Sequence, residues 1–108
     1  MISRHSAHEK RRDDMIVLNV TYKCKPGMRE RFLEAIKAEG LDEACRAEAG
    51  NSKYAYFFAA DDPDEMLLVE NWRDQEALDA HGKEPHFRRL GEMKDGFVEE
   101  TIIERFTK

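Results

Sequence analysis

The sequence contains few residues of the kinds that cross-link a chain or interrupt its regular structure: 2 cysteines, 3 prolines and 6 glycines among 108 residues. Cys24 and Cys45 lie far apart and belong to neither a Cys-x-x-Cys motif nor a Cys/His ligand pair, so we expect two buried free thiols in a reducing cytoplasm. No stretch approaches the roughly 18 apolar residues of a membrane-spanning helix, and none has the hydrophobic segment of a signal peptide. These absences predict a cytoplasmic protein without a membrane partner.

An excess of positive charge is also lacking. The chain carries 18 Lys and Arg residues against 23 Asp and Glu residues, which gives a net charge of −5. DNA- and RNA-binding domains normally present a basic face, so we expect no nucleic-acid partner. The length and the hydrophobic fraction of 41% predict a single domain with a modest core.

The common cofactor motifs are missing as well. The sequence has no GxGxxG motif, no phosphate-binding loop and no HExxH motif, and none of its serines lies in a GxSxG motif. We therefore expect no flavin, nicotinamide or nucleotide cofactor. The spacing of His81 and His86 is wrong for two ligands on one helical face, so a metal site formed with Glu70 is the less favoured alternative, and we predict none.

The hydrophobic pattern divides the chain into a short extension and one α+β domain. Residues 1–14 have no periodicity and are predicted to be disordered, which leaves residues 15–108 as the domain. Asp74 is the expected N-cap of one helix, Pro85 is expected to open another, and Gly40 interrupts the first helical pattern. The expected strands cover residues 15–23, 53–60, 66–73 and 97–106, and the expected helices begin near residues 28, 75 and 85.

This order of elements, β-α-β-β-α-β, is that of the ferredoxin-like split βαβ fold, a four-stranded antiparallel sheet with helices on one face. In a monomer the other face of the sheet should be polar. The first three strands are instead apolar on both sides, and no further part of the chain is available to cover the second face. We therefore predict a homodimer packed sheet to sheet, with the last strand reaching across to the partner.

The stretch from Met66 to Phe87 concentrates the chemically informative side chains. Alternation along the third strand places Glu70 and Trp72 on one face near the strand end, and the next helix carries His81 on its apolar side. An imidazole can act as an acid or a base near neutral pH, and an indole offers a flat surface to an aromatic substrate. Asn19 is the least expected residue of the first strand, because a buried amide needs partners, and a ligand can be one.

Structural roles compete with these functional ones. A histidine on an apolar helical face is more often a core residue than a catalyst, and a lone tryptophan more often serves packing. His86 could cap its helix or face solvent. Glu70 could pair with one of three arginines, which are Arg73, Arg88 and Arg89.

A motif in this stretch resembles the signature of the antibiotic biosynthesis monooxygenase domain, a dimeric α+β barrel. The pattern E-x-W-x-[DST]-x-x-x-L-x-x-H-x-x-x-P-H is matched by Glu70, Trp72, Asp74, Leu78, His81, Pro85 and His86. The Pro-Gly that precedes the first helix in this family corresponds to residues 26–27. A Glu-x-Gly segment before an aromatic strand corresponds to residues 48–50 and Tyr54. The resemblance covers residues 15–106.

The resemblance implies a cofactor-free monooxygenase that oxidises quinols or anthrones with O₂. A substrate phenol or enol would lose a proton in a pocket between sheet and helices, and the anion would reduce O₂ directly, leading to a quinone. In that scheme His81 is the general base or proton shuttle, Trp72 is a stacking wall, and Asn19 donates a hydrogen bond to the developing oxyanion. The residues expected to bind substrate are Glu70, Tyr54, Tyr56, His86 and Phe87.

Three alternatives remain at this level. A relative with a similar His-x-x-x-Pro-His segment isomerises a phosphorylated autoinducer, and such a substrate would need pocket cations from among Lys53, Arg73, Arg88 and Arg89. Another relative degrades haem with an asparagine, a tryptophan and a histidine, residue types that this chain also supplies. The chain could also be a dimeric small-molecule-binding module without turnover.

Overall fold

The computed structural model describes residues 15–108, so the disordered extension predicted for residues 1–14 lies outside the described part. No helix among the described residues is long and apolar enough to cross a membrane. The elements are β1 (Ile16–Cys24), α2 (Arg29–Ala38), α3 (Leu41–Arg46), β2 (Asn51–Phe58), β3 (Glu65–Trp72), α4 (Gln75–His81), α5 (Pro85–Lys94) and β4 (Val98–Thr107).

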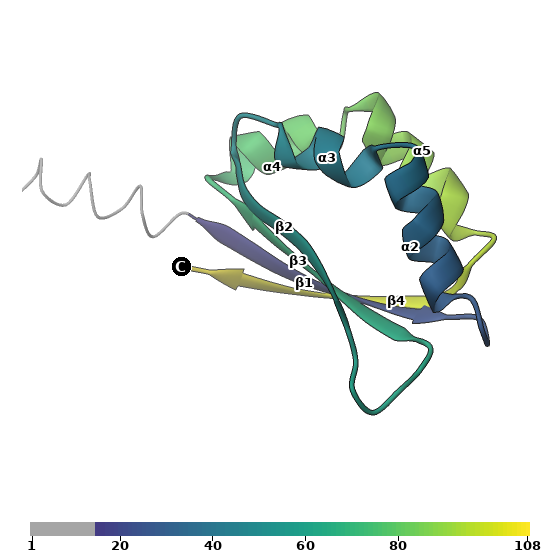
Figure 1. Ribbon diagram of the computed structural model, residues 1–108. Helices are drawn as coiled ribbons and strands as arrows, with labels where there is room; N and C mark the ends of the chain where they lie inside the picture. The colour runs from purple at the N-terminus through teal and green to yellow at the C-terminus, as the bar shows by residue number, and fades with distance from the viewer. Residues whose placement is uncertain (1–14) are drawn as a thin grey trace, which may run out of the picture.

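The four strands form one antiparallel sheet in the order β2-β3-β1-β4, and the four helices lie together on one of its faces (Figure 1). The opposite face carries no helix (Figure 1). This arrangement confirms the predicted ferredoxin-like α+β fold. β1 and β3 are the two central strands, and each strand presents alternate side chains to the helical layer and to the open face.

Glycines determine where the first helical segment begins and breaks. Gly27 has a φ of 76° and closes a turn after β1, so α2 begins at Arg29, slightly later than the sequence suggested. Gly40 has a φ of 66° and separates α2 from α3, which confirms the predicted interruption. Positive φ angles in this range are readily adopted by glycine because it lacks a Cβ. The break turns α3 towards β2 and places its C-terminal end near α4 and α5.

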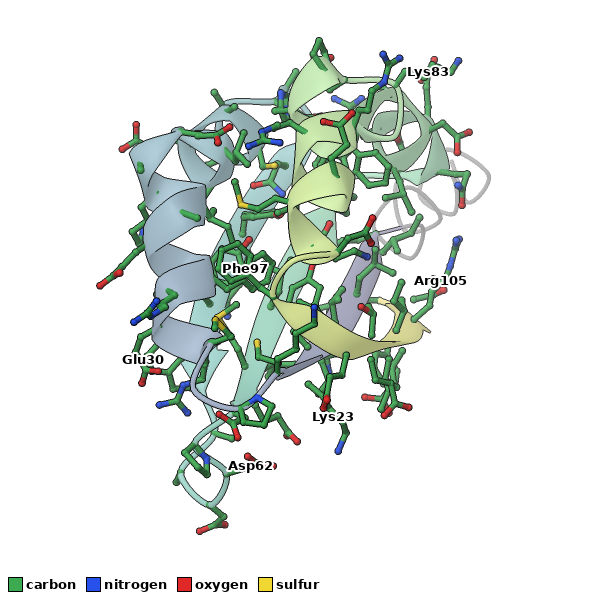
Figure 2. The ribbon with its side chains drawn as sticks, turned by 90° about the vertical axis from the view of Figure 1, so that its right-hand side faces the viewer. Lys23, Glu30, Asp62, Lys83, Phe97 and Arg105 are labelled. Carbon is green, nitrogen blue, oxygen red and sulfur yellow. The ribbon has the colours of Figure 1, made fainter. Side chains whose placement is uncertain are left out.

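The hydrophobic core fills the space between the sheet and the helices. Phe32 of α2 is fully buried and stacks on Phe97, with ring centroids 5.5 Å apart. Figure 2 shows Phe97 between α2 and α5. Cys24 and Cys45 are both buried and free, as predicted.

The open face of the sheet carries apolar side chains from all four strands, with polar residues such as Asn19 and Glu104 between them. Cross-strand pairing places Val17 of β1, Leu67 and Val69 of β3, and Phe106 of β4 on this face. Phe106 is 49% exposed, and Phe57, on the same face of β2, is 46% exposed. Exposed aromatic side chains of this kind are typical of a surface that binds a partner.

Candidate functional site

The candidate site begins where β3 ends and α4 starts. Asp74 caps α4, because its Oδ1 accepts a hydrogen bond of 2.9 Å from the backbone N–H of Ala77. This cap confirms the role predicted for Asp74 and fixes the direction in which α4 leaves the sheet. His81 is the last residue of α4, and only 2% of its surface is exposed. The helix thus delivers an imidazole into the interior.

A close approach between Gly50 and α4 sets the position of that helix. A Cβ added at Gly50 would lie 2.2 Å from the Cβ of Ala77, a separation that neither side chain could relieve by rotating. The Arg73 backbone N–H also donates to the Gly50 carbonyl at 2.8 Å, which joins the start of β2 to the end of β3. Only a glycine at position 50 permits this packing, which accounts for the Gly of the Glu-x-Gly segment.

We expect Gly50→Ala to destabilise the protein by about 1–3 kcal/mol, the usual range for overpacking in a tightly filled region. The added methyl group has to push α4 away from the sheet, and His81 moves with the helix. Urea denaturation monitored by circular dichroism measures the change. Gly91→Ala is the matched control, because a Cβ at that helical position meets nothing within 4 Å. Equal stability of the two variants would show that the contact does not position α4.

Glu48 joins the two histidines of the site. Its Oε2 lies 2.7 Å from Nδ1 of His81 and 2.7 Å from Nε2 of His86. An ionised carboxylate can only accept hydrogen bonds, so both of these ring nitrogens carry protons in this arrangement. In a neutral His81 the lone pair is then on Nε2. This is the arrangement in which a carboxylate orients an imidazole to act as a base.

Glu70 and Trp72 lie on the other side of His81. The indole Nε1–H of Trp72 donates to Oε1 of Glu70 at 2.9 Å, and that oxygen is 3.9 Å from Nε2 of His81. Burial raises the pKa of the Glu70 carboxyl, while the hydrogen bond from Trp72 and the nearby His81 act in the opposite direction. The Trp72 ring packs against the imidazole with centroids 4.5 Å apart. Trp72 therefore holds both Glu70 and His81 in place.

A surface pocket of about 550 Å³ reaches His81, and its wall includes Leu78, Lys83 and Phe87. Figure 2 shows Lys83 at the far end of the helical layer, at the connection between α4 and α5. Phe87 is 45% exposed and meets the imidazole edge to face at 5.0 Å. An aromatic molecule in this pocket could stack on Phe87 while an oxygen atom approaches His81. The pocket thus combines the aromatic surface of Phe87 with the imidazole of His81, and Lys83 and Asp79 add charged groups to its wall.

Of the three residues predicted to act in catalysis, the structure brings Trp72 and His81 together and separates Asn19 from them. Glu70 pairs with Leu18, and Trp72 pairs with Ile16, so the side chains of β1 that face the helical layer are those of even number. Asn19 pairs with Val69 and lies on the open face, on the other side of the sheet from His81. Trp72 is fully buried and offers no exposed ring face to a ligand. Of the three, only His81 borders a pocket.

The predicted substrate-binding residues are distributed unevenly. Glu70, Tyr54 and Tyr56 face the helical layer together, because Tyr54 pairs with Glu70 across β2 and β3. Tyr54 is 2% exposed, and burial raises the pKa of its phenol and of the Tyr56 phenol, so both stay protonated. Phe87 lines the pocket, and His86 lies beside it in the first turn of α5. The two tyrosines lie between the sheet and the helices, and neither lines the pocket that reaches His81.

Sequence reasoning missed Glu48 and Cys45 as members of the site. Glu48 is 33 positions from His81, in the connection between α3 and β2, and only the folding of that connection brings the two together. The Glu-x-Gly segment contained a signal for Glu48. Its glycine, Gly50, is required by the close packing against Ala77, and its glutamate, Glu48, binds both histidines. Cys45 gave no signal beyond its expected burial.

A buried carboxylate at the start of α3 holds the segment that carries Cys45 and Glu48. Asp42 is 2% exposed, and its Oδ2 accepts hydrogen bonds from Lys37 at 2.7 Å and from Arg46 at 2.6 Å. Burial acts to raise the pKa of Asp42, but these two hydrogen bonds outweigh it and hold the pKa below its ordinary value of 3.8. Arg46 also donates to the Tyr54 carbonyl at 2.8 Å, which ties α3 to β2.

We expect Asp42→Asn to lower the free energy of unfolding by about 1–3 kcal/mol at pH 7, because two charge-assisted hydrogen bonds are weakened. A depressed carboxyl pKa contributes stability above its unfolded value and loses it as the pH falls through the folded value. The difference between variant and wild type should therefore shrink below about pH 4. Urea denaturation at several pH values between neutral and acidic measures it. A difference independent of pH would show that the Asp42 charge is not responsible.

Comparison with known proteins assigns this chain to a protein family. The profile of the antibiotic biosynthesis monooxygenase family matches residues 15–92, which include Glu48, Trp72, His81 and His86. The chain belongs to this family. A curated relative from Bacillus subtilis, named "Putative monooxygenase YcnE", is 36% identical over 74 residues, which are 68% of this chain and 76% of that protein.

Solved structures of related proteins have the same fold. The crystal structure of PA3566 from Pseudomonas aeruginosa is 26% identical, has a TM-score of 0.78 and covers 88% of this chain and 94% of its own. A structure from Nitrosomonas europaea, titled as a putative antibiotic biosynthesis monooxygenase, is 23% identical, has a TM-score of 0.81 and covers 89% of this chain and 91% of its own. The second likeness concerns the fold alone. Both structures share the fold over 88–89% of this chain.

Proposed function

We propose that the protein is a cofactor-independent monooxygenase that oxidises a small aromatic quinol or anthrone with O₂. One observation carries the proposal: Glu48 binds Nδ1–H of the buried His81, so Nε2 is the unprotonated nitrogen of a neutral imidazole that borders a pocket also lined by Phe87. A base of this kind can remove the proton of a phenol or enol. The resulting anion is electron-rich enough to react with O₂ without a flavin or a metal.

The described residues have separate parts in this reaction. His81 accepts the substrate proton, and Glu48 orients the imidazole and stabilises its charged form. Phe87 provides the stacking surface that was predicted for Trp72, while Trp72 acts behind the imidazole as a positioning residue. The oxyanion contact predicted for Asn19 is not part of this proposal, because Asn19 lies on the other face of the sheet.

The alternatives find less support in the geometry. A phosphorylated substrate would need cations, and of the four considered from the sequence none lines the pocket that reaches His81; Lys83 alone does so in their place. A haem-degrading site would need Asn19, Trp72 and His81 together, and Asn19 is separated from the other two. Among the described residues, the pocket therefore fits an uncharged aromatic substrate better than either alternative ligand.

The proposal includes a homodimer formed through the open face of the sheet. All four strands carry apolar side chains on that face, and a second copy of the chain would cover them with the same side chains of its own. Pairing of this face leaves the pocket beside His81 free, because the pocket lies in the helical layer on the opposite side of the sheet.

Oxygen uptake tests the proposed reaction. Metal-stripped protein is mixed with a series of dihydroxyaromatic compounds and anthrones, and the initial rate of O₂ consumption is compared with that of buffer. With ¹⁸O₂ a monooxygenase places one labelled atom in the organic product and one in water. Absence of uptake above buffer across the series, or product without label, would contradict the proposal.

A further inference from the structure

Four side chains of the metal-ligating kinds meet behind the pocket. Cys45, Glu48, His81 and His86 each offer one ligand atom, and these four atoms lie within 4.8 Å of one another. In a tetrahedral zinc site, bonds of about 2.0–2.3 Å place neighbouring ligand atoms roughly 3.3–3.8 Å apart. The widest pair needs to close by only about 1 Å, which side-chain rotation can supply. The cluster is therefore close to the geometry of a four-coordinate cation site.

The outer nitrogens of both histidines already face carboxylates. Nε2 of His81 is 3.9 Å from Oε1 of Glu70, and Nδ1 of His86 is 4.0 Å from Oε1 of Glu84. Histidines that bind metals nearly always donate their other ring N–H to a carboxylate, a carbonyl or water. Here both imidazoles have such a group on the side away from Glu48. A general base that acts through His81 alone does not require a carboxylate beside the outer nitrogen of His86 as well.

The charge balance of the cluster favours a bound cation. Three carboxylates, those of Glu48, Glu70 and Glu84, surround the two imidazoles, and within residues 15–108 none of the three forms an ion pair with lysine or arginine. Entry is open from one side, because the side chains of Glu48 and His86 are 12% and 16% exposed. A second pocket of about 470 Å³ reaches Glu48 and Glu84.

We propose that Cys45, Glu48, His81 and His86 form a binding site for a divalent cation of the zinc class. The sequence alone pointed only to a less favoured set of His81, His86 and Glu70; the structure replaces Glu70 with Glu48 as ligand and adds a thiolate. On binding, the Cys45 thiol releases its proton to solvent. The proton on Nδ1 of His81 moves to Nε2 of the same ring, and the proton on Nε2 of His86 moves to Nδ1. In these positions the two N–H groups face the carboxylates of Glu70 and Glu84, which can accept hydrogen bonds from them.

The site also has a consequence for catalysis, which rests on the proposed function. A cation on Nδ1 of His81 places the proton on Nε2, the atom that serves as the base in the proposed oxidation. The loaded protein can then no longer accept the substrate proton. Zinc should accordingly inhibit oxygen uptake, while the metal-free protein remains the active form.

Direct metal binding tests the site without any substrate. Metal-stripped full-length protein is titrated with Zn²⁺ against a chromophoric chelator, and with Co²⁺ under reducing conditions. We expect one tightly bound ion per chain, and a thiolate-to-cobalt charge-transfer band in the near ultraviolet. Cys45→Ala should abolish the band, whereas Cys24→Ala, the matched control at the other buried cysteine, should retain it. Glu84→Gln should weaken affinity about 10- to 100-fold through loss of an outer partner.

Two further variants distinguish zinc binding at this site from zinc binding at the other histidines of the chain, His5 and His8. His86→Gln changes a partly exposed side chain and should lower zinc affinity more than Glu84→Gln does. A variant with His5→Ala and His8→Ala should bind zinc as the wild type does. The proposal is overturned by absence of a stoichiometric ion, by undiminished binding in Cys45→Ala and His86→Gln, or by loss of binding in the His5/His8 variant. Because none of these measurements uses substrate, their failure leaves the oxygen-uptake test of the proposed function intact.

Discussion

Replacing His81 with alanine is expected to slow O₂-dependent oxidation about 10²- to 10⁴-fold, the usual contribution of a general base. The imidazole borders the pocket, and Glu48 binds its Nδ1–H, so Nε2 is the nitrogen that can accept a proton. Initial rates of oxygen uptake measure the loss. Arg88→Gln serves as a control, because Arg88 is exposed on α5 and lines none of the pockets near His81.

A purely structural role for His81 makes a different set of predictions. If the imidazole only fills the core next to Trp72, His81→Ala lowers the melting temperature and activity falls in proportion to the unfolded fraction. If it is the base, the folded variant stays slow, and free imidazole diffusing into the vacated space restores part of the rate. A folded His81→Ala variant with normal rates would remove His81 from the mechanism.

The fold could be predicted from the sequence because its signals are local. The order of strands and helices, the break at Gly40 and the cap at Asp74 each follow from short patterns, and the structure confirms them. The direction in which His81 points was also readable, because its apolar neighbours share one side of α4. These features depend on residues within about two turns or one strand of each other.

Asn19 shows where local reasoning ends. Alternation reveals that Asn19 and Leu18 face opposite ways, but it does not reveal which way is inward when both faces of the strand are apolar. The register of β1 against β3 decides this, since Leu18 pairs with Glu70 and therefore faces the helices. The amide that looked out of place in a buried strand is accordingly on the open face, where a partner subunit is proposed to pack.

The positions of Glu48 and Trp72 depend on long-range packing that the sequence does not show. Glu48 reaches the site only because Gly50 lets α4 pack closely on the start of β2, a long-range contact that no periodic pattern records. Trp72 has the residue type of a ligand-stacking wall, but its depth behind the imidazole is set by α4 lying over it. The strand face of Trp72 was predictable from alternation; its distance from the surface and the position of Glu48 were not.

Introducing a charge at the centre of the open face is expected to abolish the proposed dimer. Val69 lies on β3 in the middle of the sheet, opposite Asn19 of β1, and its side chain is partly exposed in the single chain. In Val69→Glu the carboxylate remains in water as long as the chain is a monomer. In a two-fold symmetric dimer two such carboxylates would be buried together, without a cationic partner and near their like charge. Sedimentation equilibrium at micromolar concentration should show the wild type as a dimer and the variant as a monomer.

Ala38→Glu adds the same charge to an exposed position on α2, in the helical layer, and should remain dimeric. Circular dichroism distinguishes dissociation from unfolding, because a dissociated Val69→Glu chain keeps its helices and strands. The exposed Phe57 and Phe106 would then increase binding of a hydrophobic dye in this variant relative to both controls. A wild-type chain that sediments as a monomer would leave the apolar face without a partner and contradict the sheet-to-sheet packing. Equal dimerisation of all three proteins would place the interface elsewhere, away from the central strands.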